Sequence, residues 1–164
     1  MIALLDDAPC DVAVLIGGAI GKGPVVVPFS GAEHDWAAIE LGGWLARGMG
    51  STLQIVGAAA VDGGRDASML IGNASLAVQR TLGVAAQPML VDPTGDALVE
   101  STRTAGVVVV GLTERWRREG LGRVRSALAA QAERPTLLVH RGLRPGALAP
   151  PRSATRFTWT VNVG

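Results

Sequence analysis

The segment 111–126, GLTERWRREGLGRVRS, combines residue types that could bind a phosphate group. Its three glycines expose backbone N–H groups where a strand gives way to a helix, and such amides form concave anion sites that the helix dipole reinforces. Guanidinium groups add planar, bidentate phosphate donors. The segment therefore has the chemistry of a phosphate site, held by backbone amides or by five side chains: Arg115, Arg117, Arg118, Arg123 and Arg125.

The same segment also has an interpretation without a ligand. Glu114 and Glu119 lie among the arginines, and exposed ion pairs of this kind contribute little to stability. Trp116 could cap a site, stack on a ring or pack against a partner subunit. From these residues we favour a solvated or interface surface, and the arginine-based phosphate site is the alternative.

Acid–base chemistry has one candidate, His34 between Glu33 and Asp35. Adjacent polar residues in a loop usually cap a helix, and Asp35 is predicted to be the N-cap of the helix that follows it. Ser30 lacks the glycines that flank the nucleophile of many hydrolases. Cys10 is the only cysteine and there are two histidines, too few for the clustered ligands of a zinc site. We therefore predict no catalytic residue and no metal.

Composition restricts the location and the partners of the chain. Its 164 residues are 48% hydrophobic and carry a formal net charge of +1, which favours a folded core and gives no general attraction to nucleic acid. The apolar runs are shorter than the roughly 20 residues that span a bilayer, and the first residues lack the basic segment of a signal peptide. We expect a soluble, cytoplasmic protein that does not bind nucleic acid.

The elements alternate between strands and helices from residue 24 to residue 141. Continuous apolar strands that alternate with helices are typical of a parallel sheet covered on both faces. Pro88 cannot donate to a sheet ladder, so its strand is expected at an edge. The sequence predicts a three-layer, doubly wound α/β domain with five parallel strands, at 24–29, 52–58, 85–91, 106–111 and 135–140, and helices at 36–50, 67–82, 95–104 and 123–132.

Both ends lie outside this predicted domain. The stretch ALLDDAPCDVAVLI (3–16) aligns with ALAAQAERPTLLVH (127–140), because a helix end gives way to a strand at the same offset in both. We interpret residues 1–23 as the remnant of a preceding repeat with its linker. Residues 142–164 are a C-terminal tail whose apolar patch, Phe157, Trp159 and Val161, could pair as a strand or dock on a neighbour.

Three stretches resemble the universal stress protein family. VVVPFSGAEHDWAAIELGGWLA (25–46) is similar to its opening strand, loop and helix. VVVVGL (107–112) followed by GRVRSALAAQAERPTLLVH (122–140) is similar to its closing strand, loop, helix and strand, and APCDVAVLI (8–16) to its typical ending. The resemblance implies the strand order 3-2-1-4-5.

The resemblance also implies where a nucleotide would bind. In the family's nucleotide-binding branch the last crossover carries Gly, two residues, Gly, nine residues, then Gly and Ser or Thr. Here Gly111 matches the first glycine, and Glu114 replaces the second. Gly122 best matches the third glycine but lies two residues before the expected position, and Arg123 follows it where the motif has a hydroxyl residue. Ser30 stands where the family has an acidic residue. The candidate nucleotide-binding residues are Pro28, Phe29, Ser30, Gly111, Glu114, Gly122, Arg123 and Val124.

These departures favour a non-catalytic, stress-sensing regulatory domain with a degenerate nucleotide site, and with no cofactor or only weakly bound ATP or AMP. The alternative is an ATP- or AMP-binding switch, at most a weak ATPase, that uses the arginine-rich loop 111–126. The resemblance further implies a homodimer or tandem-domain pairing. It also implies a link to an upstream membrane transporter, a cation/proton antiporter, with this domain on the cytoplasmic side.

Overall fold

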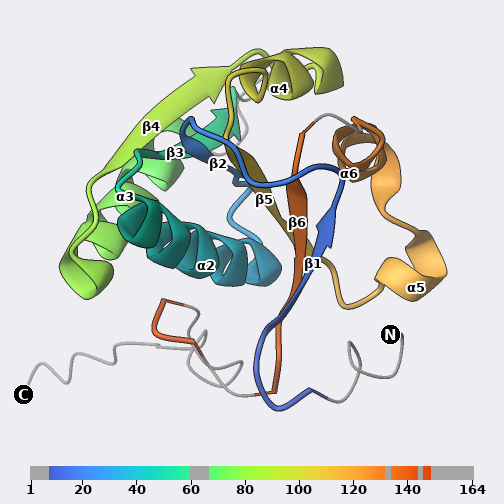
Figure 1. Cartoon of the computed structure of the whole chain (residues 1–164), viewed down its shortest axis with the longest axis horizontal. Helices are drawn as coiled ribbons and strands as arrows, with labels where there is room; N and C mark the ends of the chain where they lie inside the picture. Colours follow the sequence, from blue (N-terminus) through green and yellow to red (C-terminus); the bar gives the residue numbers. More distant parts are fainter. Residues whose placement is uncertain (1–7, 60–66, 132–133, 144–145, 149–164) are drawn as a thin grey trace, which may run out of the picture.

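The structure is a computed structural model, which describes residues 8–59, 67–131, 134–143 and 146–148 (Figure 1). The strands are β1 (Val12–Ile16), β2 (Val25–Pro28), β3 (Leu53–Ala58), β4 (Ala86–Val91), β5 (Val107–Leu112) and β6 (Thr136–His140). The helices are α2 (Glu33–Met49), α3 (Ala67–Leu82), α4 (Gly95–Ser101), α5 (Trp116–Glu119) and α6 (Gly122–Ala129). Every predicted strand is present, and α3 has the predicted bounds.

The strands form one sheet in the order β1-β6-β5-β2-β3-β4. The five strands from β2 to β6 are parallel to one another and have the predicted order 3-2-1-4-5, with β4 and its Pro88 at one edge. The prediction of five strands was wrong by one, because β1 pairs antiparallel with the outer edge of β6, from Val12 opposite His140 to Ile16 opposite Thr136. The edge of β6 is thus occupied by a strand of the same chain.

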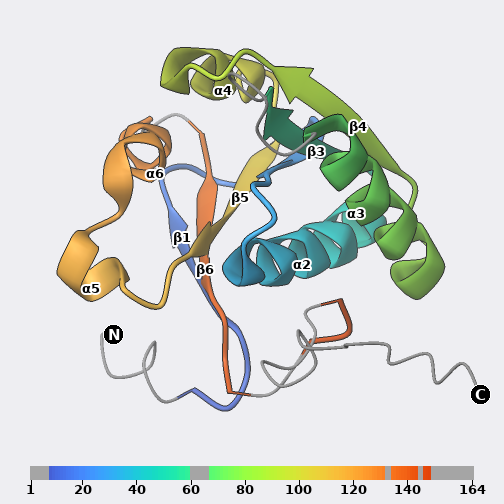
Figure 2. The ribbon, with the colours of Figure 1, turned by 180° about the vertical axis from the view of Figure 1, so that it is seen from behind.

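Helices cover both faces of the sheet, so the predicted three layers are confirmed. Figure 2 shows α2 and α3 on one side and α4 and α6 on the other. The two central strands between them are apolar: all six residues of β5 are buried, as are Val25, Val26 and Val27 of β2. Strands buried on both faces need apolar side chains at every position, which explains why the sequence shows continuous runs instead of alternation.

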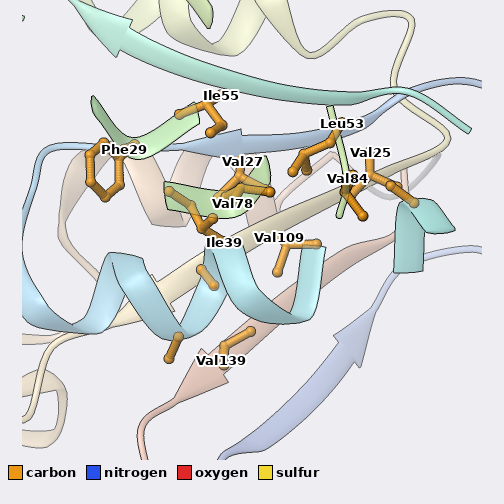
Figure 3. Packing of buried hydrophobic residues seen from close by; sticks show 14 of the residues in the cluster. Val25, Val27, Phe29, Ile39, Leu53, Ile55, Val78, Val84, Val109 and Val139 are labelled. Atoms are coloured by element: carbon orange, nitrogen blue, oxygen red, sulfur yellow. The ribbon is translucent and has the colours of Figure 1, made fainter. Parts of the chain in front are cut away.

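Each face has its own core. Beneath α2 and α3, the sheet contributes Val25, Val27, Ile55 and Val109, which pack around Ile39 of α2 (Figure 3). Beneath α6, the buried residues are Val108, Val110, Leu112, Leu128 and Leu138. The alternation of Val107 to Val110 between the two cores follows from the two-residue period of a strand.

Three local predictions need correction. Helix α2 begins at Glu33, with Ala32 as its N-cap, so Asp35 is not the N-cap but the third helical residue. Its carboxylate reaches back to the N–H of Ala32, at 3.3 Å, and satisfies a donor that the helix itself leaves unpaired. The last two predicted helices end early, at Ser101 and Ala129, and the short helix α5 was not predicted.

The two ends of the chain are described only in part. Residues 1–7 and 149–164 lie outside the described residues, and with them the patch of Phe157, Trp159 and Val161. The assignment of 1–23 and 142–164 to separate regions therefore stays a prediction. In the part of the chain that is described, no helix is both long enough and apolar enough to cross a membrane.

Candidate functional site

The carboxyl ends of the parallel strands β2, β3 and β5 lie side by side, and doubly wound folds bind their ligands at such strand ends. Phe29 continues the ladder beyond β2, because its N–H donates to the Val56 carbonyl at 2.8 Å. A cavity of about 410 Å³ opens beside these strand ends, within the size range of small-molecule sites. Its apolar walls are Pro28, Phe29, Val56, Ala58, Ala67, Leu70, Leu98, Val110, Val124 and Leu128; we call it the apolar cavity.

Three polar side chains also line the apolar cavity, Ser30, Asp35 and Arg125. The Asp35 carboxylate is buried, and its Oδ2 accepts hydrogen bonds from the Ser30 N–H at 2.8 Å and the Ser30 hydroxyl at 2.6 Å. Helix α2 therefore brings a carboxylate against Ser30, the position where the sequence lacked the expected acid. The first turn of α2 supplies this negative charge where the helix dipole favours it.

Arg125 connects α6 to the end of β5 and to the start of α2. Its Nε donates to the Gly111 carbonyl at 2.7 Å, and one of its terminal nitrogens lies 2.8 Å from Nε2 of His34. Because a guanidinium group has no acceptor, Arg125 is the donor and Nε2 of His34 is the acceptor. The same Nε2 lies 3.4 Å from Oδ1 of Asp35, a longer contact than the one with Arg125. With Arg125 as the donor, His34 is neutral and carries its proton on Nδ1.

The environment of His34 supports the neutral form. Burial lowers the pKa of His34 below 6.5, and the Arg125 guanidinium lowers it further, although the carboxylates of Asp35 and Glu33 act in the opposite direction. Desolvation disfavours the charged imidazolium more than these carboxylates stabilise it. His34 therefore stays an acceptor for Arg125 at neutral pH.

A second cavity, of about 590 Å³, lies on the other side of this pair. We call it the polar cavity; it is lined by Glu33, His34, Leu112, Thr113, Glu114, Arg115, Glu119, His140 and Arg141. Both of its arginines are in ion pairs, Arg141 with Glu33 at 2.8 Å and Arg115 with Glu119 at 3.6 Å. Since His34 lines the polar cavity and Arg125 the apolar one, their hydrogen bond lies at the boundary between the two.

Half of the predicted site residues line the apolar cavity: Pro28, Phe29, Ser30 and Val124. Gly111 lies at the end of β5, where any side chain would collide with the backbone of His34, so a glycine is required there by close approach. Glu114 lines the polar cavity instead. Gly122 and Arg123 are exposed and line neither cavity; Gly122 has φ +74°, which favours glycine for conformational reasons alone.

Sequence reasoning missed Asp35 and the wall residues of β3 as members of this site, and it named Arg125 only as one of five arginines that could hold a phosphate. Helical spacing contained a signal for Arg125. Residues three apart share a helix face, and Arg125 is three residues before Leu128, which is buried. Val56 could have been found from the parallel pairing of neighbouring strands, because its partner in the register is Pro28.

No protein-family model matches the sequence, and no curated protein matches it. Solved structures do match. A universal stress protein from Archaeoglobus fulgidus has 19% sequence identity and a TM-score of 0.59, over 72% of this chain and 98% of that one. A universal stress protein in complex with cAMP has 21% identity and a TM-score of 0.52, over 73% of this chain and 98% of that one.

A third structure matches over a larger share of this chain. It is a universal stress protein from Archaeoglobus fulgidus DSM 4304, with 16% identity and a TM-score of 0.59. It covers 85% of this chain but only 52% of its own, longer chain. With the strand order and the three layers, these similarities establish that the chain has the fold of the universal stress proteins.

Proposed function

We propose that this chain is a regulatory domain that binds a nucleoside-containing ligand in the apolar cavity. The observation that carries the proposal is the cavity itself, about 410 Å³ at the carboxyl ends of β2, β3 and β5. Its apolar walls suit a flat base, and polar side chains converge from the ends of β2 and from two helices. The structure of a universal stress protein with cAMP agrees with a nucleotide as the kind of ligand.

The proposed role is binding and not turnover. Asp35 is the carboxylate of the apolar cavity, and its Oδ2 accepts three hydrogen bonds, from two N–H groups and one hydroxyl. These hydrogen bonds tie the carboxylate to the segment that precedes α2, which is a structural role. We therefore expect a bound nucleotide to be recovered chemically unchanged, with weak ATP hydrolysis as the competing outcome.

The test is isothermal titration calorimetry with adenosine. Ala58→Trp places a large side chain on the wall of the apolar cavity at a position that is exposed, so the substitution does not overpack the core. We expect it to weaken adenosine binding at least tenfold. Ala13→Trp is the control, since Ala13 is an exposed strand residue of β1 outside the cavity. Equal affinity of wild type and Ala58→Trp would refute binding in this cavity.

The wider setting of the domain is a separate part of the proposal. We propose that β1 derives from a preceding repeat, which is supported by its antiparallel pairing with β6, against the parallel direction of every other pair. Pairing with a second domain or copy, and a link to a cation/proton antiporter, are proposals that rest on the family resemblance. The upstream reading frame tests them, because ten or more apolar segments of about 20 residues there would identify a transporter.

A further inference from the structure

We infer that Arg125 is the residue that selects the ligand's anionic group, and that it selects a single phosphate over a triphosphate. This inference rests on the proposed function. It assigns a role to a residue that the glycine-based phosphate motif does not include. Its basis is the arrangement of charges around the two cavities.

Among the residues that the structure describes, the apolar cavity offers one positive charge to a ligand, that of Arg125. The ionisable residues lining this cavity are Asp35 and Arg125. The Asp35 carboxylate bonds Ser30 and Ala32 and lies 3.4 Å from Nε2 of His34. Arg125 uses two of its five N–H donors, for Gly111 and His34. The remaining donors of Arg125 are suited to a planar, charge-assisted contact with one phosphate group.

Arg125 is held in a fixed position before any ligand arrives. Its hydrogen bonds join three elements: α6, which carries it, the end of β5 and the first turn of α2. A long flexible side chain loses rotamer entropy when it orders, so prior ordering lowers the cost of binding. His34 acts here as a positioning residue, because its neutral Nε2 accepts from the guanidinium.

Further phosphates would meet an unfavourable environment. Beyond the His34–Arg125 pair lies the polar cavity, with the carboxylates Glu33, Glu114 and Glu119. Its arginines already pair with two of these carboxylates, so a β- or γ-phosphate would have to compete with them. Like charges close together in a site cost free energy. We therefore expect AMP to bind more tightly than adenosine, and ATP no more tightly than AMP.

The experiment compares the dissociation constants of adenosine, AMP and ATP for the full chain by calorimetry. A charge-assisted contact is worth enough that AMP should bind about tenfold more tightly than adenosine. Arg125→Gln should abolish this preference, and a cooperative urea transition shows that the variant is folded. Arg103→Gln, at an exposed arginine paired with Glu100 at the end of α4, is the matched control and should retain the preference.

His34 is tested by the same AMP-to-adenosine ratio. His34→Gln keeps a hydrogen-bond acceptor and should retain the preference, whereas His34→Leu should lose it while its urea transition stays cooperative. A role confined to folding would change both ligands equally, so a preference retained in His34→Leu would refute the positioning role.

The possible failures are distinguishable. Adenosine binding without a preference for AMP in the wild type, a preference retained in Arg125→Gln, or ATP binding tenfold more tightly than AMP would overturn the selection by Arg125 and leave the proposed function standing. Absence of binding for all three ligands would overturn both.

Discussion

Arg115 and Arg125 belong to the same arginine-rich stretch, yet the structure places them in different environments. Arg115 precedes the short helix α5, is 70% exposed and has an ion pair with Glu119 four residues along the chain. Arg125, in α6, bonds the end of β5 and the first turn of α2, at 14 and 91 residues of separation. The two arginines differ because Arg125 has hydrogen-bond partners on other elements, far away in the sequence, which fix its side chain, and residue type alone does not reveal such partners.

Substitutions at the contact between β5 and α2, which holds Arg125, should have the largest effect on stability. In Gly111→Ala the new methyl group would collide with the backbone of His34, which cannot move without shifting α2. Overpacking against backbone costs about 3 kcal/mol, so we expect the free energy of unfolding in urea to fall by about that amount.

Gly48→Ala is the matched control for Gly111→Ala. Gly48 lies near the end of α2 with open space around its Cα, and alanine is the better helix former there. We expect unchanged or slightly higher stability. If the two substitutions had similar effects, the tight contact between β5 and α2 would be contradicted.

The His34–Arg125 bond should give the stability of the domain a pH dependence. The pKa of His34 is lowered in the folded chain, so below about 6.5 the unfolded chain binds the proton more readily. Stability contributed by neutral His34 is therefore fully present above about pH 6.5 and is lost as the pH falls toward the folded pKa. Chemical unfolding between pH 7.5 and 5 measures this decline.

His34→Gln supplies the comparison for the pH series, because its side chain can accept a hydrogen bond and does not titrate. We expect a shallower decline of stability in this variant than in the wild type. Parallel curves for the two proteins would mean that other groups account for the pH dependence.

The exposed arginines should give the smallest effect. Arg115→Gln removes an exposed ion pair, whose contribution is typically below about 0.5 kcal/mol. We expect the midpoint of urea unfolding to stay nearly unchanged, in contrast to Arg125→Gln, which loses two hydrogen bonds across elements. A larger loss for Arg115→Gln than for Arg125→Gln would reverse the comparison.

Much of the fold was accessible from the sequence because it depends on local patterns. The valine runs at 25–27 and 107–110 indicated strands buried on both faces, and Pro88 indicated an edge. Strand β1 was harder to place, since its apolar residues are compatible with either direction and with several partners. Only the pairing of Val12 to Ile16 with β6 decided its direction.

The candidate site was likewise predictable from the sequence only in part. From the sequence, Pro28 and Phe29 end a buried strand and Ser30 follows it. The carboxyl ends of parallel strands lie side by side, so the place of these residues beside β3 and β5 was predictable. Asp35 was assigned as a helix cap, because local sequence rules give no reason for its carboxylate to turn back to Ser30.

The sequence by itself determined the alternation of buried strands and helices. With that alternation it determined the three layers and the carboxyl ends of the strands as the place where a ligand could bind. Periodicity and apolar content are properties of neighbouring residues, so they can be read without a structure. The tertiary structure alone decided which polar side chains lie at those strand ends. Asp35 meets Ser30, and Arg125 reaches His34 and Gly111, because packing of α2 and α6 on opposite faces of the sheet brings their ends to β2 and β5.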